Sequence, residues 1–240
     1  MTRARGKVVQ QVEAGILHRN DQFPHLYWQN FLAVDCTRQL SAQSLIAEAE
    51  RHFADLPIRH VLVTDAQAAA HLRTGFLEGG YQEVVIVTML LRRPPDREPP
   101  AADLVELDAA QLGPTVEAYM RDSPRARDED AQRELSQLKE DLGRSGVRFL
   151  AARVDGEVAG WCELRRHGAG GQVEDVVVLE PFRGRGLARA LLCGAVKRLR
   201  ADGCEPIFVV ADDNDTVKDL YRRLGFDDDR RRWSFWWPGL

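Results

Sequence analysis

Cysteine is scarce in this chain, and the cysteines that are present form no ligand pattern. Cys36, Cys162, Cys193 and Cys204 stand far apart. No Cys-x-x-Cys pair occurs, and no cysteine stands in a pattern with histidine ligands, which argues against a zinc site and against a disulfide framework. We therefore expect no metal, and four reduced cysteines that serve packing.

Long apolar runs are also missing. No segment approaches the length that crosses a membrane. The basic start of the chain leads into Gln10, Gln11 and Glu13 rather than into an apolar stretch, so we do not expect a secretory signal. The prediction is a cytoplasmic protein with no membrane partner.

An excess of charge of one sign is absent as well. The formal net charge is −4, which disfavours a nucleic-acid partner, although the arginines leave room for a local basic patch. Hydrophobic residues make up 44% and charged residues 29% of the 240 residues, as in a globular protein. A chain of this length can form one large or two small domains.

The clearest break in composition lies at residues 92–100. Four prolines and five charged residues there exclude both a helix and a central strand. We interpret this stretch as an interdomain linker. The predicted domains are residues 1–93 and 101–240, joined by a proline-rich linker at 94–100.

Hydrophobic spacing predicts the elements of the second half. Short alternating or continuous apolar runs indicate strands, and apolar residues at helical spacing indicate helices. The predicted order is strand 104–107, helices 109–119 and 128–142, strands 147–154, 158–164 and 173–179, helix 187–200, strand 207–211, helix 216–224 and strand 233–237. This order predicts an α/β fold with a mixed sheet.

A glycine-rich turn, Arg183-Gly184-Arg185-Gly186-Leu187-Ala188, connects the buried strand 173–179 to the next helix. Glycines let backbone N–H groups approach a ligand closely, and the helix dipole adds positive potential where a pyrophosphate would bind. The two arginines add charge. A tight strand-to-helix connection with solvent-facing arginines remains the alternative for the loop taken alone.

The loop resembles the Arg/Gln-x-x-Gly-x-Gly/Ala signature of the GCN5-related N-acetyltransferase (GNAT) superfamily, which it matches at Arg183, Gly186 and Ala188. Residues 214–226 resemble the family's second signature, an asparagine, a tyrosine seven residues later and then Leu-Gly-Phe. The resemblance covers residues 103–237. It implies the GNAT acyl-CoA N-acyltransferase fold, an α/β (α+β) fold with a mixed sheet.

The resemblance implies acetyl-CoA as a co-substrate. In the family, the cofactor lies where the buried strand separates from its neighbour, and a backbone N–H of that strand can polarise the thioester carbonyl. Asn214 bonds the pantetheine arm or caps the following helix. The implied cofactor-binding residues are Val176, Val178, Arg183, Gly184, Arg185, Gly186, Leu187, Ala188 and Asn214.

The resemblance also places a general acid. Tyr221 stands at the family's position for a phenol that protonates or positions the departing CoA thiolate, and packing at a helix end is its alternative role. Glu174, Asp175 and Glu163 are candidates for the base that deprotonates the amine, and Glu174 is the first choice. Strand alternation predicts Glu174, Val176 and Val178 on one face and Asp175 on the other.

The first half resembles a worn copy of the second. At an offset of 145 residues, Gly80-Tyr81 falls on Gly225-Phe226, and small gaps bring the strand predicted at 62–65 onto 209–212. The loop positions read Arg38 to Gln43 without glycine, and Phe76 stands where Tyr221 stands. We therefore expect two tandem domains, of which the first is incomplete and lacks the chemistry.

The predicted function is transfer of an acetyl group from acetyl-CoA to a primary amine of a small molecule or peptide, by direct attack in a ternary complex. Another acyl group or acceptor, or a non-catalytic acyl-CoA sensor, remains open. The aromatic strand 233–237 is compatible with a pocket wall, a domain junction or a homodimer contact. Family resemblance does not identify the acceptor.

Overall fold

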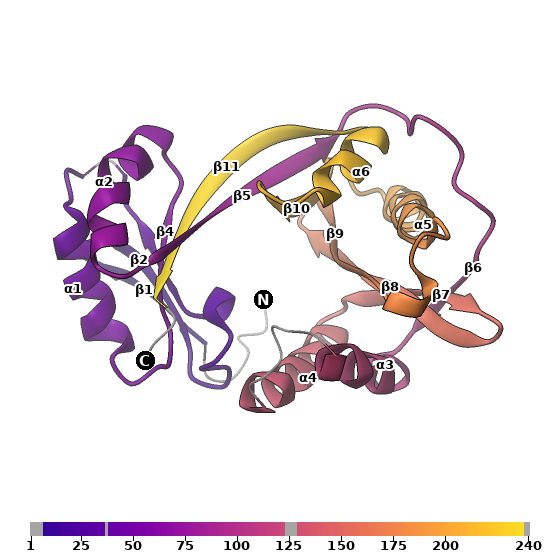
Figure 1. Cartoon of the computed structure of the whole chain (residues 1–240), viewed down its shortest axis with the longest axis horizontal. Helices are drawn as coiled ribbons and strands as arrows, with labels where there is room; N and C mark the ends of the chain where they lie inside the picture. Colours follow the sequence, from indigo (N-terminus) through magenta and orange to yellow (C-terminus); the bar gives the residue numbers. More distant parts are fainter. Residues whose placement is uncertain (1–6, 37, 123–128, 238–240) are drawn as a thin grey trace. The chain divides into compact units, whose positions relative to one another are not determined.

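The computed structural model describes residues 7–36, 38–122 and 129–237, which form two compact units (Figure 1). The first unit holds the described residues up to Ile86, the short stretch Arg133–Leu135 and residues 231–237. The second unit holds Val87–Gln132 and Ser136–Arg230. Each unit has a hydrophobic core of its own.

The second unit contains most of the elements predicted from residue 101 on. Its sheet has the strand order β5-β10-β9-β8-β7-β6. The elements are β5 (Gln82–Leu91, in part), β6 (Asp103–Leu107), α3 (Ala109–Asp122), α4 (Glu129–Arg144), β7 (Arg148–Val154), β8 (Glu157–His167), β9 (Gly170–Val178), the 3-10 helix η3 (Glu180–Phe182), α5 (Leu187–Ala201), β10 (Ile207–Asp212), α6 (Val217–Arg223) and the start of β11 (Phe226–Trp237).

The core of this unit lies between α5 and the sheet. Leu191, Leu192, Ala195 and Leu199 recur at helical spacing, and all four are fully buried. They pack in one cluster with inward-facing residues of β7 to β10 and with Tyr221 of α6. The apolar periodicity that predicts this helix is therefore the pattern that fixes it on the sheet.

The pairing of β9 with β10 is short. The two strands are parallel, and their paired residues run only from Gly171 and Ile207 to Val173 and Val209. β9 continues to Val178 and β10 to Asp212 beyond the last pair. The segment 174–178 is therefore paired in register with β8 alone, as the predicted separation of the buried strand from its neighbour requires.

The first unit has the sheet order β1-β2-β3-β4-β11. Helices α1 and α2 lie side by side against this sheet (Figure 1). Leu45, Phe53, Phe76 and Phe235 form the fully buried centre of its core. The elements are β1 (Lys7–Val12), β2 (Gly15–Asn20), the 3-10 helix η1 (Tyr27–Gln29), β3 (Phe31–Val34), α1 (Ala42–Phe53), β4 (Arg59–Val63) and α2 (Ala66–Glu78).

The internal repeat is confirmed. The order β1-β2-β3-α1-β4-α2-β5 matches β7-β8-β9-α5-β10-α6-β11, and α1 and α5 begin 145 residues apart, at Ala42 and Leu187. Both repeats also pair their third strand in parallel with the strand after the helix. Among the described residues of the first copy, nothing corresponds to β6, α3 and α4, so this copy is incomplete.

The repeats exchange their last strands. β5 belongs to the first repeat, but its residues from Val87 on lie in the second unit, where β5 neighbours β10. β11 belongs to the second repeat, but Trp233 to Trp237 pair with Val63 to Arg59 of β4 in the first unit. The aromatic strand 233–237 thus lies between β4 and β5 in the strand order.

The units therefore differ from domains divided at residues 94–100. The chain passes from the first unit to the second within β5, and it returns to the first within β11. A cut in the proline-rich stretch would separate each sheet from a strand that it uses. The division into domains 1–93 and 101–240 stays a prediction.

The proline-rich stretch is anchored to the second unit. The backbone N–H groups of Arg92 and Arg93 both donate to the carbonyl of Gly225. The Arg93 side chain pairs with Asp227 at 2.6 Å, and Arg92 pairs with Asp229 at 2.8 Å. These contacts explain why this stretch, although it has the composition of a linker, is held against the second unit.

The predicted helices and strands of the second half are confirmed, with shifted ends. The last strand begins at Phe226 rather than at 233. The prediction missed its first half because the charged run 227–232 shows no alternation of apolar and polar residues. In the first half, the strand predicted at 62–65 ends at Val63, since Asp65 caps α2 by accepting from Ala68 N. Asp128, the predicted start of α4, lies outside the described residues.

Candidate active site

The glycine-rich loop leads into α5 with an open helix end. Gly184 and Gly186 have φ angles of 76° and 78°, a region that side chains strongly disfavour, so both positions require glycine. Gly186 is the N-cap of α5 and has no side chain to cap it, and no side chain of the described residues accepts a hydrogen bond from the first turn of the helix. The N–H groups of that turn remain available to an anion.

A cavity of about 260 Å³ lies beside this helix end. Of the predicted cofactor-binding residues, Val178, Arg183, Gly184, Gly186, Leu187 and Ala188 line it. The other residues of its wall are Arg97, Phe182, Arg189, Leu220 and Arg223. The wall thus combines four arginines, two glycines and a helix N-terminus, a composition suited to phosphate groups.

The equivalent helix end of the first repeat is closed. Ser41, which stands 145 residues before Gly186, is the N-cap of α1, and its hydroxyl accepts from Ser44 N at 3.1 Å. The Ser44 hydroxyl in turn accepts from Ser41 N, which completes a capping box. The first repeat satisfies its helix end internally, where the second leaves it open.

Val176 and Val178 lie on β9 beyond its last pair with β10, and both pack against the α5-facing core. The carbonyl of Val178 accepts a hydrogen bond from Arg183 Nε at 3.1 Å. This contact ties the loop to the strand, so the two predicted parts of the cofactor site are joined directly.

A β-bulge interrupts β9 at the base candidates. Asp175 has a φ angle of 52°, and the register with β8 shifts between Trp161 and Glu163. Glu174 lies opposite Glu163, and Val177 lies opposite Trp161, so Glu174 and Val177 share a face. The Asp175 carboxylate accepts from Trp161 Nε1 at 3.3 Å, which places it on that face too.

The predicted alternation is therefore wrong at this point. Glu174 and Asp175 share one face, and Val176 and Val178 pack into the α5 core on the other. One extra residue in β9 reverses the pattern, because each residue inserted between two pairs turns the following side chains to the opposite face.

Tyr221 is 6% exposed and packs within the core of the second unit, beside Phe226. Burial raises the pKa of its phenol, and the negative charges of Glu174 and Asp215 raise it further. Tyr221 is therefore protonated at neutral pH, the form that a proton donor requires. A charged Glu174 thus disfavours the phenolate form of Tyr221.

Glu174 is held by a hydrogen-bonded chain. The Gln172 side-chain amide donates to its carboxylate, and the Gln172 carbonyl oxygen lies 2.7 Å from His167 Nε2. Burial raises the pKa of Glu174, and Glu163 and Asp175 add to this effect against the opposing charge of Arg165. A carboxyl with a raised pKa is a better proton acceptor than an ordinary surface glutamate.

A buried ionic cluster adjoins Glu174. The ammonium of Lys139, from α4, binds both Glu163 and Asp175, and Arg165 binds the second oxygen of Glu163. Lys139 is 5% exposed and Glu163 is fully buried. Sequence reasoning missed Lys139, because nothing in the amphipathic pattern of a helix marks one lysine as buried.

Three predicted cofactor residues, Val176, Arg185 and Asn214, do not line the cavity. The guanidinium of Arg185 lies over the Phe182 ring, 5.5 Å from its centroid. Asn214 is exposed in the turn before α6, and Asp215, rather than Asn214, accepts from the first backbone N–H of that helix, Val217 N. Their roles stay predictions.

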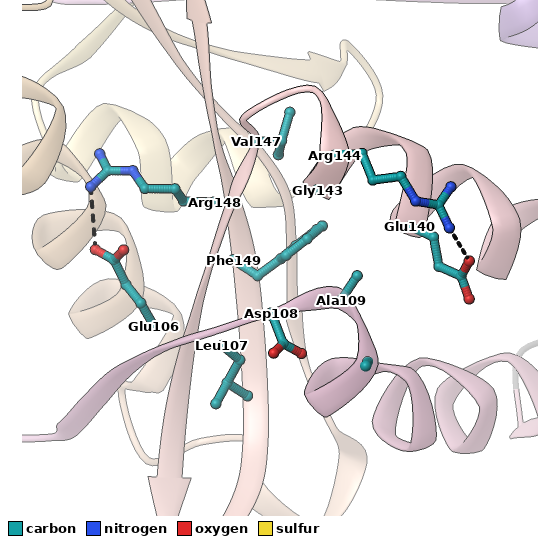
Figure 2. Close-up of a pocket in the computed structure, with 11 residues that line it drawn as sticks. Glu106, Leu107, Asp108, Ala109, Glu140, Gly143, Arg144, Val147, Arg148 and Phe149 are labelled. Carbon is teal, nitrogen blue, oxygen red and sulfur yellow. Dashed lines mark hydrogen bonds and ion pairs between the residues drawn. The ribbon is translucent and has the colours of Figure 1, made fainter. Parts of the chain in front are cut away.

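A larger cavity, of about 650 Å³, lies elsewhere in the second unit, between the end of β6, the end of α4 and the start of β7 (Figure 2). None of the predicted site residues lines it. Figure 2 shows Arg144 paired with Glu140, and Arg148 paired with Glu106. Both arginines of its wall are thus paired with carboxylates of the same wall.

Comparison with known families agrees with this geometry. Residues 113–226, which contain the bulged strand, the glycine loop and Tyr221, match the model of the acetyltransferase (GNAT) family. The chain contains a GNAT acetyltransferase domain. Membership suggests an acyltransferase that uses an acyl-CoA, whereas the acyl group and the acceptor vary within such a family.

Solved structures share the fold over nearly the whole chain. A conserved protein of unknown function from Staphylococcus epidermidis ATCC 12228 has a TM-score of 0.72 at 15% identity, covering 98% of this chain and 95% of its own. A GCN5-related N-acetyltransferase from Kribbella flavida has a TM-score of 0.61 at 14% identity, covering 97% and 90%. A tandem GNAT protein from the clavulanic acid biosynthesis pathway has a TM-score of 0.58 at 16% identity, covering 97% and 83%.

These likenesses concern the fold. The match to a tandem GNAT protein supports the repeat seen here, in which the second copy is the GNAT domain. In the described parts of the chain, no helix is long and apolar enough to span a membrane. No group of three or more metal-binding side chains occurs among the described residues either.

Proposed function

We propose that the GNAT domain transfers an acetyl group from acetyl-CoA to a primary amine by direct attack in a ternary complex. The observation that carries this proposal is the cavity at the open N-terminus of α5, which Val178 of β9 also lines. This cavity offers backbone N–H groups and arginines to a pyrophosphate. The first repeat has no equivalent site, because its helix α1 is capped by Ser41.

The reaction needs two proton transfers. The amine nitrogen attacks the thioester carbon, the C–N bond forms, and the C–S bond breaks to release CoA thiolate. Tyr221 donates its proton to the thiolate, and Glu174 accepts the proton that the attacking nitrogen loses. A backbone N–H of β9 near Val176 stabilises the oxyanion between the two steps.

The raised pKa values suit these roles. Tyr221 keeps its proton through the neutral range, because burial and Glu174 disfavour the phenolate. Glu163 and Asp175 on the same face are paired with Lys139 and Arg165, so the Glu174 carboxylate is the one left to meet a cationic amine. These features support an amine rather than an anionic acceptor.

The substitution Ala188→Glu tests the cofactor site. Ala188 lies in the first turn of α5 and lines the cavity, and it does not have the left-handed backbone that would confound a substitution at Gly186. A carboxylate there repels phosphate, so we expect the Kd for acetyl-CoA to rise about 100-fold, measured by calorimetric titration. The wild-type chain is expected to bind one equivalent, because α1 has a closed helix end.

Ala188→Gln is the matched control, since it adds the same bulk without charge and should weaken binding much less. Equal affinity of Ala188→Glu and the wild type, or two equivalent sites per chain, contradicts the assignment. Acceptor identity then requires an amine screen that follows CoA release against hydrolysis without acceptor.

The substitution Glu174→Gln tests the base. Because burial raises the pKa of Glu174 above its ordinary 4.5, kcat/KM is expected to fall as pH drops through that raised value. Glutamine should remove this acidic limb and lower kcat near neutral pH about tenfold, a modest loss because water can replace the carboxylate. The measurement is a pH profile of both chains with the exposed Glu157→Gln as control. An unchanged limb in Glu174→Gln assigns the proton to another acceptor.

A further inference from the structure

The proline-rich stretch lies directly on the cofactor loop. Asp96 pairs with Arg189 of α5 at 2.6 Å, and Asp96 N donates to the carbonyl of Arg223 at 2.8 Å. Arg189 is only 4% exposed. The ring of Pro100 lies so close to Gly186 that a Cβ there would come within 2.8 Å of Pro100 Cγ. These contacts hold the stretch against the first turn of α5.

Arg97 is the residue of this stretch that lines the 260 Å³ cavity. The backbone carbonyl of Arg97 accepts a hydrogen bond from the Arg189 side chain at 3.2 Å, which holds the backbone of Arg97 in position. In the residues that the structure describes, its guanidinium makes no hydrogen bond or ion pair. By contrast, Arg183 binds Val178 O and Arg189 binds Asp96, so their donors are partly committed.

We propose that Arg97 binds a phosphate group of the CoA ligand, so that the proline-rich stretch contributes a side chain to the cofactor site. The inference rests on the proposed function and extends it to a residue outside both GNAT signatures. An acyl-CoA presents a pyrophosphate and a ribose 3′-phosphate, more anionic groups than one helix N-terminus can neutralise. Arg97 supplies a cation to that surplus.

The charges around Arg97 leave its own charge available. Asp96 is paired with Arg189, and the hydrogen bond and charge of Arg189, with a smaller effect of Arg97, lower the pKa of its carboxyl; Glu98 does not line the cavity. An exposed arginine gains little from a flexible partner, but here contacts made by its neighbours already order the backbone. Binding a phosphate therefore costs mainly the ordering of one side chain.

The experiment compares Arg97→Ala, Arg97→Lys and Arg97→Glu with wild type by calorimetric titration of acetyl-CoA, 3′-dephospho-CoA and acetyl-pantetheine. We expect Arg97→Ala to raise the Kd for acetyl-CoA about tenfold, the loss of one charge-assisted contact. Arg97→Lys should restore part of the affinity, and Arg97→Glu should weaken binding further. The Arg97 side chain is exposed and makes no hydrogen bond or ion pair with the described residues, so these chains should fold normally.

Arg92→Ala is the matched control, because Arg92 lies in the same stretch, pairs with Asp229 and does not line the cavity. Its Kd should equal that of wild type. Acetyl-pantetheine, which has no phosphate, should bind all chains alike. If the Arg97→Ala effect disappears with 3′-dephospho-CoA, the ribose phosphate is the partner, and if it persists, the pyrophosphate is.

The two proposals fail in distinguishable ways. If Arg97→Ala binds acetyl-CoA as wild type does and Ala188→Glu does not bind it, the proposed role of Arg97 is wrong and the cofactor site stands. A loss equal for acetyl-CoA and acetyl-pantetheine also overturns it, because the contact would not be to phosphate. Wild type that binds no acetyl-CoA overturns both.

Discussion

Replacing Tyr221 with phenylalanine is expected to lower kcat about 100-fold or more, while the Kd for acetyl-CoA stays within about threefold of wild type. The substitution removes one oxygen and keeps the ring that packs against Phe226 in the core. Loss of a group that acts only as the thiolate forms appears in kcat rather than in binding.

The protonation state of Tyr221 sharpens this expectation. Burial and Glu174 raise the pKa of its phenol above the ordinary 10.0, so deprotonation of Tyr221 should not limit wild-type activity below that pH. If Tyr221 is the acid, the residual rate of Tyr221→Phe should depend strongly on added buffer acids, which replace the missing proton donor.

A second buried tyrosine provides the control. Tyr81 packs in the core of the first unit, and burial raises its pKa to about 12. Tyr81→Phe therefore removes a similar hydroxyl outside the GNAT domain, and its kcat should match wild type. Equal rates for Tyr221→Phe and wild type under saturating substrates would return Tyr221 to a packing role.

Local sequence features could predict much of the site. The loop from Arg183 to Ala188 and the helix that carries Tyr221 depend on glycine, on helical spacing and on neighbouring residues, all of which are visible in the chain. The difference between the two helix ends also depends on local sequence, because a serine at an N-cap can accept a hydrogen bond from the first turn and a glycine cannot.

The bulge could not be predicted in this way. Asp175 is not a glycine, yet it has a positive φ, and the contacts that hold its carboxylate come from Lys139 and Trp161, elsewhere in the chain. A period-2 pattern continues through Glu174, Val176 and Val178 without any local sign of the extra residue. Tertiary contacts decide the face there.

The strand exchange and the position of Arg97 beside the cavity could not be predicted for related reasons. β5 and β11 have the same strand pattern whichever sheet receives them, so the sequence does not tell which neighbour each strand pairs with. Residues 92–100 have the composition of a linker, and their anchoring depends on Arg189 and Gly225, far along the chain. Composition predicts the lack of regular structure but not what the segment covers.

The substitution Lys139→Met is expected to lower the free energy of unfolding at neutral pH by about 3–5 kcal/mol, because it leaves Glu163 and Asp175 buried without their shared cation. Burial alone would lower the pKa of Lys139, but Asp175 and Glu163 outweigh burial and raise it. Lys139 in turn outweighs the effect of burial on Asp175 and lowers its pKa.

The directions of these two pKa shifts define the pH range in which the cluster stabilises the fold. The contribution of Asp175 is present above its ordinary pKa of 3.8 and is lost as pH falls through its lower folded value. The contribution of Lys139 is present below 10.5 and is lost as pH rises through its higher folded value. At neutral pH the wild-type cluster therefore stabilises the fold fully.

Chemical denaturation at several pH values measures the effect, with Lys197→Met, an exposed lysine on α5, as the control that should stay within about 0.5 kcal/mol of wild type. Without the ammonium, the buried carboxylates hold their protons to higher pH, so acidification stabilises Lys139→Met relative to wild type and the difference shrinks. Adding Asp175→Asn to Lys139→Met should recover part of the loss at neutral pH, since it removes one uncompensated charge. A loss that is the same at every pH would instead reflect the packing of the lysine chain, and the cluster would then contribute nothing through its charge.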